Sequence, residues 1–114
     1  DWKVLDPSEA KKYHQLRFSL AKELGKNQDA VQSMFAYLQD KKNLSELRSD
    51  TTFEKLTSSF SELDARTRLR VLEEFSKPSS ITVAYMSYLE AEKLYYQGNK
   101  TDSMTLITWL ENNF

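Results

Sequence analysis

The stretch ITVAYMSYLEAEKLYYQ, residues 81–97, predicts the fold more clearly than any other part of the chain. It contains no glycine or proline, and it follows Ser79 and Ser80, either of which is a good helix cap. It is followed directly by Gly98, a residue that commonly ends helices in the left-handed conformation. Residues 81–97 are therefore expected to form one continuous helix.

This helix carries an unusually wide apolar belt. At about 100° per residue, its apolar side chains cover an arc of about 160°, with Val83 and Leu94 on the far side. The belt consists of Ile81, Ala84, Tyr85, Tyr88, Leu89, Ala91, Tyr95 and Tyr96. A belt of this width predicts a central helix that contacts several neighbours.

Helix signals recur on both sides of this segment. Asp6, Pro7 and Glu9 combine a capping-box spacing with a proline at the first helical position, and Pro78 ends the helix that precedes the central one. Periodic apolar residues then predict helices over residues 7–24, 28–41, 52–63, 65–76, 81–97 and 102–113, with a short turn at 44–48.

Composition supports a single helical domain over residues 1–114. The chain has 114 residues, of which 39% are hydrophobic, and only two glycines and two prolines. So few turn residues disfavour a many-stranded sheet and favour helices joined by short links. We expect an all-α fold, either a compact bundle or a right-handed stack of about five to six antiparallel helices.

The first predicted helix has an apolar stripe of its own. Tyr13, Leu16, Leu20 and Leu24 recur at helical spacing, which predicts that this side of the helix faces the core. The same reasoning places Phe18 away from the buried face.

Two charged residues lie on apolar stripes. Arg17 projects from the stripe of the first helix, and Glu92 lies among the tyrosines of residues 81–97. Burying an unpaired charge costs several kcal/mol, so each needs a partner. We expect Arg17 and Glu92 to approach one another, either as a structural ion pair or as a polar groove that accepts a charged side chain of a partner.

Two large aromatic residues lie off the predicted stripes. Phe18 and Trp109 could pack beneath a neighbouring helix, or they could serve as contact residues at an interface, where buried aromatic side chains often dominate affinity. Trp109 is the first candidate for contact with a partner, followed by Phe18, Arg17 and Glu92. Self-association through Phe18 or Trp109 is a further option, and the oligomeric state stays open.

The sequence contains few of the residues that commonly serve in catalytic sites. Cysteine is absent and His14 is the only histidine, so no metal, cofactor or catalytic residue is predicted, and an enzyme is not expected. The chain also lacks an apolar run long enough for a membrane span and a glycine-rich loop for phosphates. The absence of cysteine favours a reducing, intracellular compartment.

Charge gives no strong indication of a nucleic-acid partner. The formal net charge is −1, and the densest basic run is Arg66, Arg68 and Arg70. Glu62, Glu73 and Glu74 lie three or four residues from these arginines, so the charges can be balanced along their own helix. Nucleic acid is therefore not the expected partner.

These observations favour a protein–protein interaction domain with an adaptor or regulatory role in a larger intracellular protein. We expect it to dock a helix or peptide of another protein in a groove between helices. The alternative is a nucleic-acid-associated regulatory domain that uses the Arg66–Arg70 helix.

Overall fold

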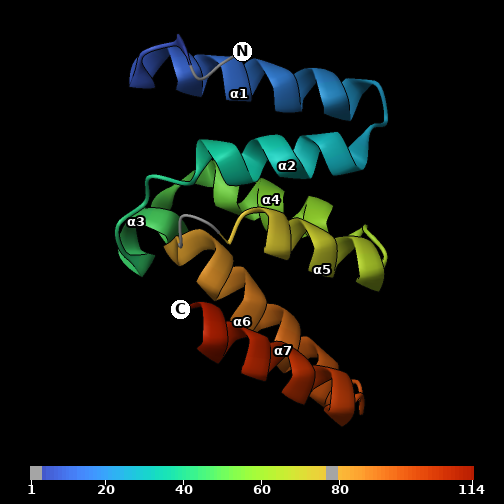
Figure 1. The fold of residues 1–114 in the computed structure, drawn as a ribbon. Coiled ribbons are helices and arrows are strands. Elements are labelled where there is room, and N and C mark those ends of the chain that lie inside the picture. Colours follow the sequence, from blue (N-terminus) through green and yellow to red (C-terminus); the bar gives the residue numbers. More distant parts are fainter. Residues whose placement is uncertain (1–3, 77–79) are drawn as a thin grey trace.

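The computed structural model describes residues 4–76 and 80–114, and every regular element in these ranges is helical (Figure 1). The all-α prediction is confirmed. In chain order, the described helices are α1 (Pro7–Glu23), α2 (Asn27–Tyr37), α3 (Leu44–Ser49), α4 (Thr51–Ser61), α5 (Ala65–Glu74), α6 (Ile81–Tyr96) and α7 (Lys100–Asn113).

The helix ends follow from local capping interactions. Asp6 Oδ1 accepts a hydrogen bond from the Glu9 amide at 2.9 Å, and Ser80 Oγ accepts one from the Val83 amide at 3.2 Å. Gly98 has a φ of 83°, the left-handed conformation in which glycine avoids the Cβ clash. The predicted stop at Pro78 and the alternative cap Ser79 lie outside the described residues.

One predicted boundary differs from the structure by more than two residues. The second predicted helix, 28–41, ends early because the chain leaves α2 after Tyr37 through tight turns that end at Asp40. The short helical turn expected at 44–48 corresponds to α3, whose cap Asn43 accepts a hydrogen bond from the Glu46 amide at 2.9 Å.

The helices are arranged in layers, with principal extents of 41 × 29 × 25 Å. The α1–α2 hairpin lies at one end and the α6–α7 hairpin at the other, with α3, α4 and α5 between them (Figure 1). Helix α1 packs chiefly on α2 and is the outermost element at its end of the stack. No helix in the described part of the chain is long and apolar enough to cross a membrane.

The centre of the core is an aromatic cluster that joins three helices. The ring of Phe35 on α2 lies 6.0 Å from that of Phe60 on α4 and 5.5 Å from that of Phe75, the residue that ends α5. Leu38 and Leu56 are among the fully buried side chains of the same core. This cluster fixes α4 and α5 against α2.

The predicted buried face of α1 is wrong. The helix buries His14, Phe18 and Ala21 instead, and Phe18 packs edge-on against Tyr37 of α2 at 6.0 Å. The predicted stripe faces outward, with Leu16 61% and Leu24 69% exposed. The reason is that α1 lies at the edge of the stack, where one neighbour covers only one of its sides.

The predicted belt of α6 is only partly buried: Ala91 is buried, and Ile81, Ala84, Tyr85 and Leu89 are half-buried. The buried side is centred on Val83 and Glu90, whereas Tyr88, Tyr95 and Tyr96 are exposed. Tyrosine can leave its hydroxyl in water, while a small polar residue can be buried if it is hydrogen-bonded. Thr82 illustrates this, because its hydroxyl donates to the Leu38 carbonyl at 2.9 Å.

The burial of His14 predicts a dependence of stability on pH. Burial, and secondly the positive charge of Arg17, hold the pKa of His14 below its ordinary value of 6.5. The unfolded chain therefore binds a proton more readily than the folded one, so stability is complete above about pH 6.5 and falls as the pH decreases below it. We expect a lower urea midpoint at about pH 5.5 than at about pH 7.5, a range in which ordinary carboxyl groups stay ionised.

The matched control is His14→Gln, which should remove most of this difference. The folded protein can also be titrated directly, because His14 is its only histidine and gives a single imidazole signal by NMR. A titration midpoint at or above 6.5 would contradict the prediction.

Candidate functional site

Two surface grooves of similar volume lie on the described part of the molecule. One, of about 490 Å³, lies between α1 and α4 and has Phe18 and Met34 at its base. Both side chains are almost fully covered by the protein, so this groove offers little apolar surface to a ligand. The other, of about 530 Å³, is lined by more apolar residues and is the better candidate.

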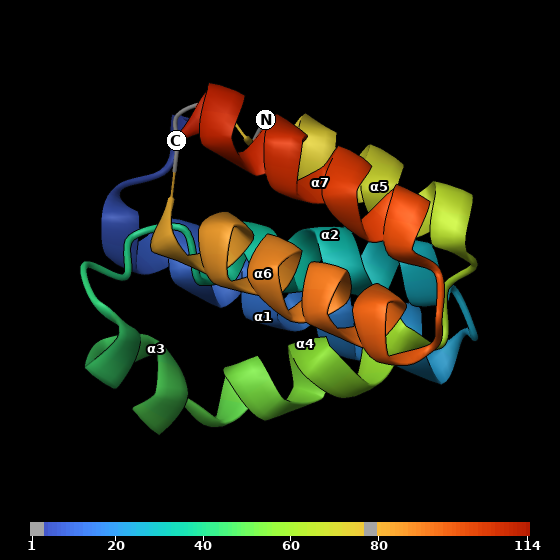
Figure 2. The same ribbon diagram turned by 90° about the horizontal axis from the view of Figure 1, so that it is seen from below.

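This second site, named here the α5–α7 groove, lies between α5 and α7 with α6 at its base. Figure 2 shows α5 and α7 on the same side of the molecule, opposite α3 and α4. The lining residues are Ala65, Arg66, Leu69, Leu72, Glu73, Glu90, Leu94, Asn99, Asp102, Thr105, Leu106 and Trp109.

The floor of the groove is apolar. Leu72 and Leu106 belong to the buried core, Leu94 and Trp109 are half-buried, and Leu69 is exposed. Trp109 also packs edge-on against Phe114 at 6.1 Å. Displacing water from a concave apolar surface of this kind makes the binding of an apolar ligand more favourable.

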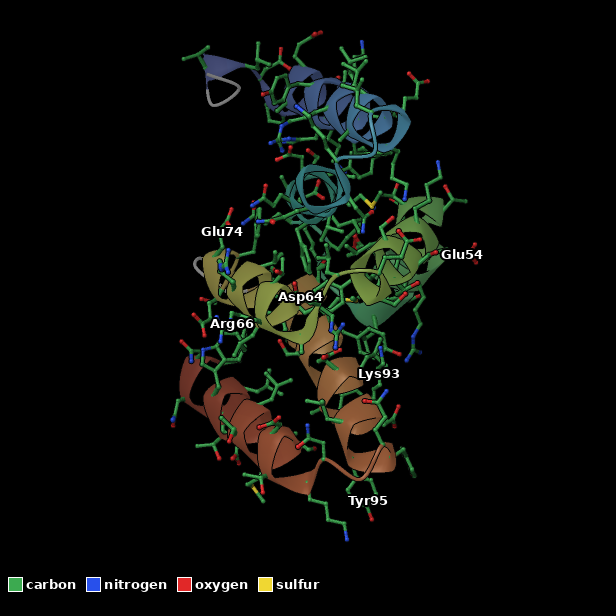
Figure 3. All side chains as sticks on the ribbon, turned by 90° about the vertical axis from the view of Figure 1, so that its right-hand side faces the viewer. Glu54, Asp64, Arg66, Glu74, Lys93 and Tyr95 are labelled. Carbon is green, nitrogen blue, oxygen red and sulfur yellow. The ribbon has the colours of Figure 1, made fainter. Side chains whose placement is uncertain are left out.

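The rim of the groove is charged and mainly acidic. Glu73 lies on the α5 wall and Asp102 on the α7 wall, where Asn99 Nδ2 donates to Asp102 Oδ2 at 2.8 Å. Arg66 is the one basic residue of the lining and extends from α5 (Figure 3). The rim therefore favours a ligand that carries positive charge beside an apolar face.

A buried ion pair holds α5 against α6 at the base of the groove. Arg68 Nε lies 2.8 Å from Glu90 Oε2, and Arg68 Nη1 donates to the carbonyl oxygen of Leu63. Arg68 is 9% exposed and Glu90 8%. Because both charges are removed from water, loss of either partner would leave the other buried without its counter-charge, so the pair links α5 to α6 at the base of the groove.

Arg17 and Glu92 do not meet, contrary to the prediction. Arg17 lies on α1 and pairs with α2, where Nη1 donates to Ser33 Oγ at 2.6 Å and Nη2 lies 3.5 Å from Asp29 Oδ1. Glu92 faces outward on α6 and accepts a hydrogen bond from the Tyr88 hydroxyl at 3.1 Å. That hydrogen bond raises the pKa of Tyr88, with a further contribution from the Glu92 charge.

Among the four residues predicted to contact a partner, Trp109 alone lines the α5–α7 groove. Phe18 is buried against α2 and lines the other groove, and Arg17 and Glu92 lie on α1 and α6 outside the site. Their role in binding a partner stays a prediction.

The ion pair of Arg68 and Glu90 was missed, although it carries the expected signal. Arg68 shares a helix face with Leu72 and Phe75, and Glu90 shares one with Met86. A charge on an apolar face was the criterion that selected Arg17 and Glu92. It predicts the wrong pair because the apolar stripe of α1 is exposed and the apolar belt of α6 is only partly buried.

The burial of Arg68 also divides the basic run. Arg66 and Arg70 are exposed, but Arg68 points into the protein. In the part of the chain that the structure describes, no group of three or more His, Asp or Glu side chains is arranged to hold a metal ion.

Neither a protein-family model, nor a curated protein, nor a solved structure matches this chain.

Proposed function

We propose that the protein is an interaction domain that binds an amphipathic helix of another protein in the α5–α7 groove, as an adaptor or regulatory domain of a larger intracellular protein. The observation that carries the proposal is the groove itself, with its apolar floor between two walls that each bear an acidic residue. Helix-in-groove binding uses such a surface, since the apolar side chains of the guest supply affinity and its charges supply orientation.

The dimensions of the walls suit a helical guest. Helix α7 has 14 residues and is therefore about 21 Å long, enough to lie beside about four turns of another helix. The guest would present apolar residues three and four positions apart to Leu69 and Trp109.

The charge of the rim selects the flanking residues of the guest. Glu73 and Asp102 lie on opposite walls, so lysine or arginine on both sides of the guest's apolar face would be favoured. The same acidic rim repels the phosphates of a nucleic acid. With Arg68 buried in its ion pair, the α5 helix presents to solvent only two of the three arginines on which the nucleic-acid alternative depends.

Selection from a random library of 16-residue peptides displayed on phage tests the proposal. We expect selected peptides to carry apolar residues at helical spacing with flanking basic residues. Leu69→Asp and Trp109→Ala should each weaken the binding of a selected peptide tenfold or more in fluorescence anisotropy, since a central apolar contact often contributes about 2 kcal/mol.

The matched control is Met104→Asp, which changes a 64% exposed side chain on α7 that does not line the groove. It should leave peptide affinity unchanged. Selected peptides that bind Leu69→Asp as tightly as the unmodified protein would refute the proposal. Binding of duplex DNA that falls steeply with added salt, and is lost in Arg66→Glu/Arg70→Glu, would support the nucleic-acid alternative instead.

A further inference from the structure

The outward side of α1 is an apolar stripe that no described part of the chain covers. The stripe consists of Tyr13, Leu16, Leu20 and Leu24, and we name it the α1 stripe. All four side chains are exposed, although burying apolar surface of leucine and tyrosine would be favourable. Helix α1 lies at the outer end of the stack and packs chiefly on α2 (Figure 1), and the four side chains are 39–69% exposed.

Opposite charges lie on one flank of this stripe. Lys12 is near its start and Glu23 near its end, and both are exposed. They are eleven residues apart, which is close to three full helical turns, so the two side chains lie on nearly the same line along the helix. The line runs beside the leucines, on the side away from Arg17.

This pattern is complementary to itself when two copies of α1 run in opposite directions. If Leu16 of one copy lies opposite Leu20 of the other, Tyr13 lies close to Leu24 of the second copy. In the same register Lys12 lies across from Glu23 of the second copy, and the two-fold axis repeats each contact. In a parallel pair, the two-fold axis would place the flank that carries Lys12 and Glu23 beside the opposite flank of the second copy, so the two residues would not meet.

We propose that the protein forms a two-fold symmetric dimer in which the α1 stripes of two copies pack antiparallel. The apolar side chains supply the affinity, and the Lys12–Glu23 contacts set the direction and register. The seam is formed by one helix of 17 residues from each copy, about 25 Å long, so we expect a dimer that dissociates on dilution. This surface is separate from the α5–α7 groove and leaves it free.

Analytical ultracentrifugation over a range of protein concentrations tests the dimer. We expect a species of twice the 13.3 kDa chain mass at high concentration, and the monomer on dilution. Leu16→Asp should raise the dissociation constant at least tenfold. Since Leu16 is exposed, the thermal unfolding midpoint of the Leu16→Asp variant should change little. Met104→Asp provides a matched control at another exposed position and should still dimerise.

Charge reversal tests the antiparallel register. Lys12→Glu and Glu23→Lys should each weaken the dimer about three- to tenfold, because each places like charges across both symmetric contacts. The double variant Lys12→Glu/Glu23→Lys should restore the original dissociation constant. A monomer at all concentrations, a dimer unaffected by Leu16→Asp, or single reversals without effect would each overturn the proposal. None of these outcomes changes the peptide-binding prediction for the α5–α7 groove.

Discussion

Replacing Arg68 with methionine is expected to lower the free energy of unfolding by about 3–5 kcal/mol, the usual cost of leaving one member of a buried ion pair without its partner. Glu90 is 8% exposed, and without Arg68 its carboxylate would remain buried while losing the hydrogen bond of 2.8 Å. Urea unfolding followed by circular dichroism at neutral pH measures this change.

Two further variants separate the ion pair from other effects of the substitution. Arg70→Met, two residues away on the same helix and exposed, should change stability by no more than about 0.5 kcal/mol. The double variant Arg68→Met/Glu90→Leu should recover most of the loss, because it removes both charges together. Equal effects of Arg68→Met and Arg70→Met would show that the pair does not hold α5 to α6.

Phe35→Ala is the second substitution with a large expected effect, a loss of about 3–5 kcal/mol of unfolding free energy. Phe35 is fully buried, and its ring contacts Phe60 and Phe75, so truncation leaves a cavity where α2, α4 and α5 meet. Urea unfolding again provides the measurement.

The control for this cavity is Leu16→Ala on the exposed side of α1. It removes a large apolar side chain without opening a cavity, and its effect should stay within about 0.5 kcal/mol at a concentration where the protein is monomeric. A small effect of Phe35→Ala would mean that the core lies elsewhere. A large effect of Leu16→Ala would mean that the stripe of α1 is buried, as its sequence pattern predicts.

Both large effects bear on the candidate site, because they concern the two attachments of α5. Phe75 at the end of α5 packs on Phe35, and Arg68 in its middle is paired with Glu90. The opposite face of α5 provides Leu69 and Glu73 to the groove. Arg68→Met and Phe35→Ala, neither of which changes a lining residue, are therefore also expected to weaken peptide binding.

Part of the site could be predicted from the sequence. Trp109 was identified because a large aromatic residue lay off the apolar stripe of its helix, and it lines the groove. Leu69 could not be identified as a site residue in this way, since a leucine among the periodic residues of 65–76 is expected to be buried. Its exposure depends on how far α7 lies from α5, and no local pattern encodes that distance.

Helix positions were determined by the sequence alone. Caps such as Asp6 and Ser80, and stops such as Gly98, act over three or four residues, so their effect is visible in the local pattern. Which side of each helix is buried was decided only by the tertiary structure. Leu16 and Tyr96 are exposed while Arg68 and Glu90 are buried, because burial depends on where neighbouring helices lie and on whether a polar group finds a partner there.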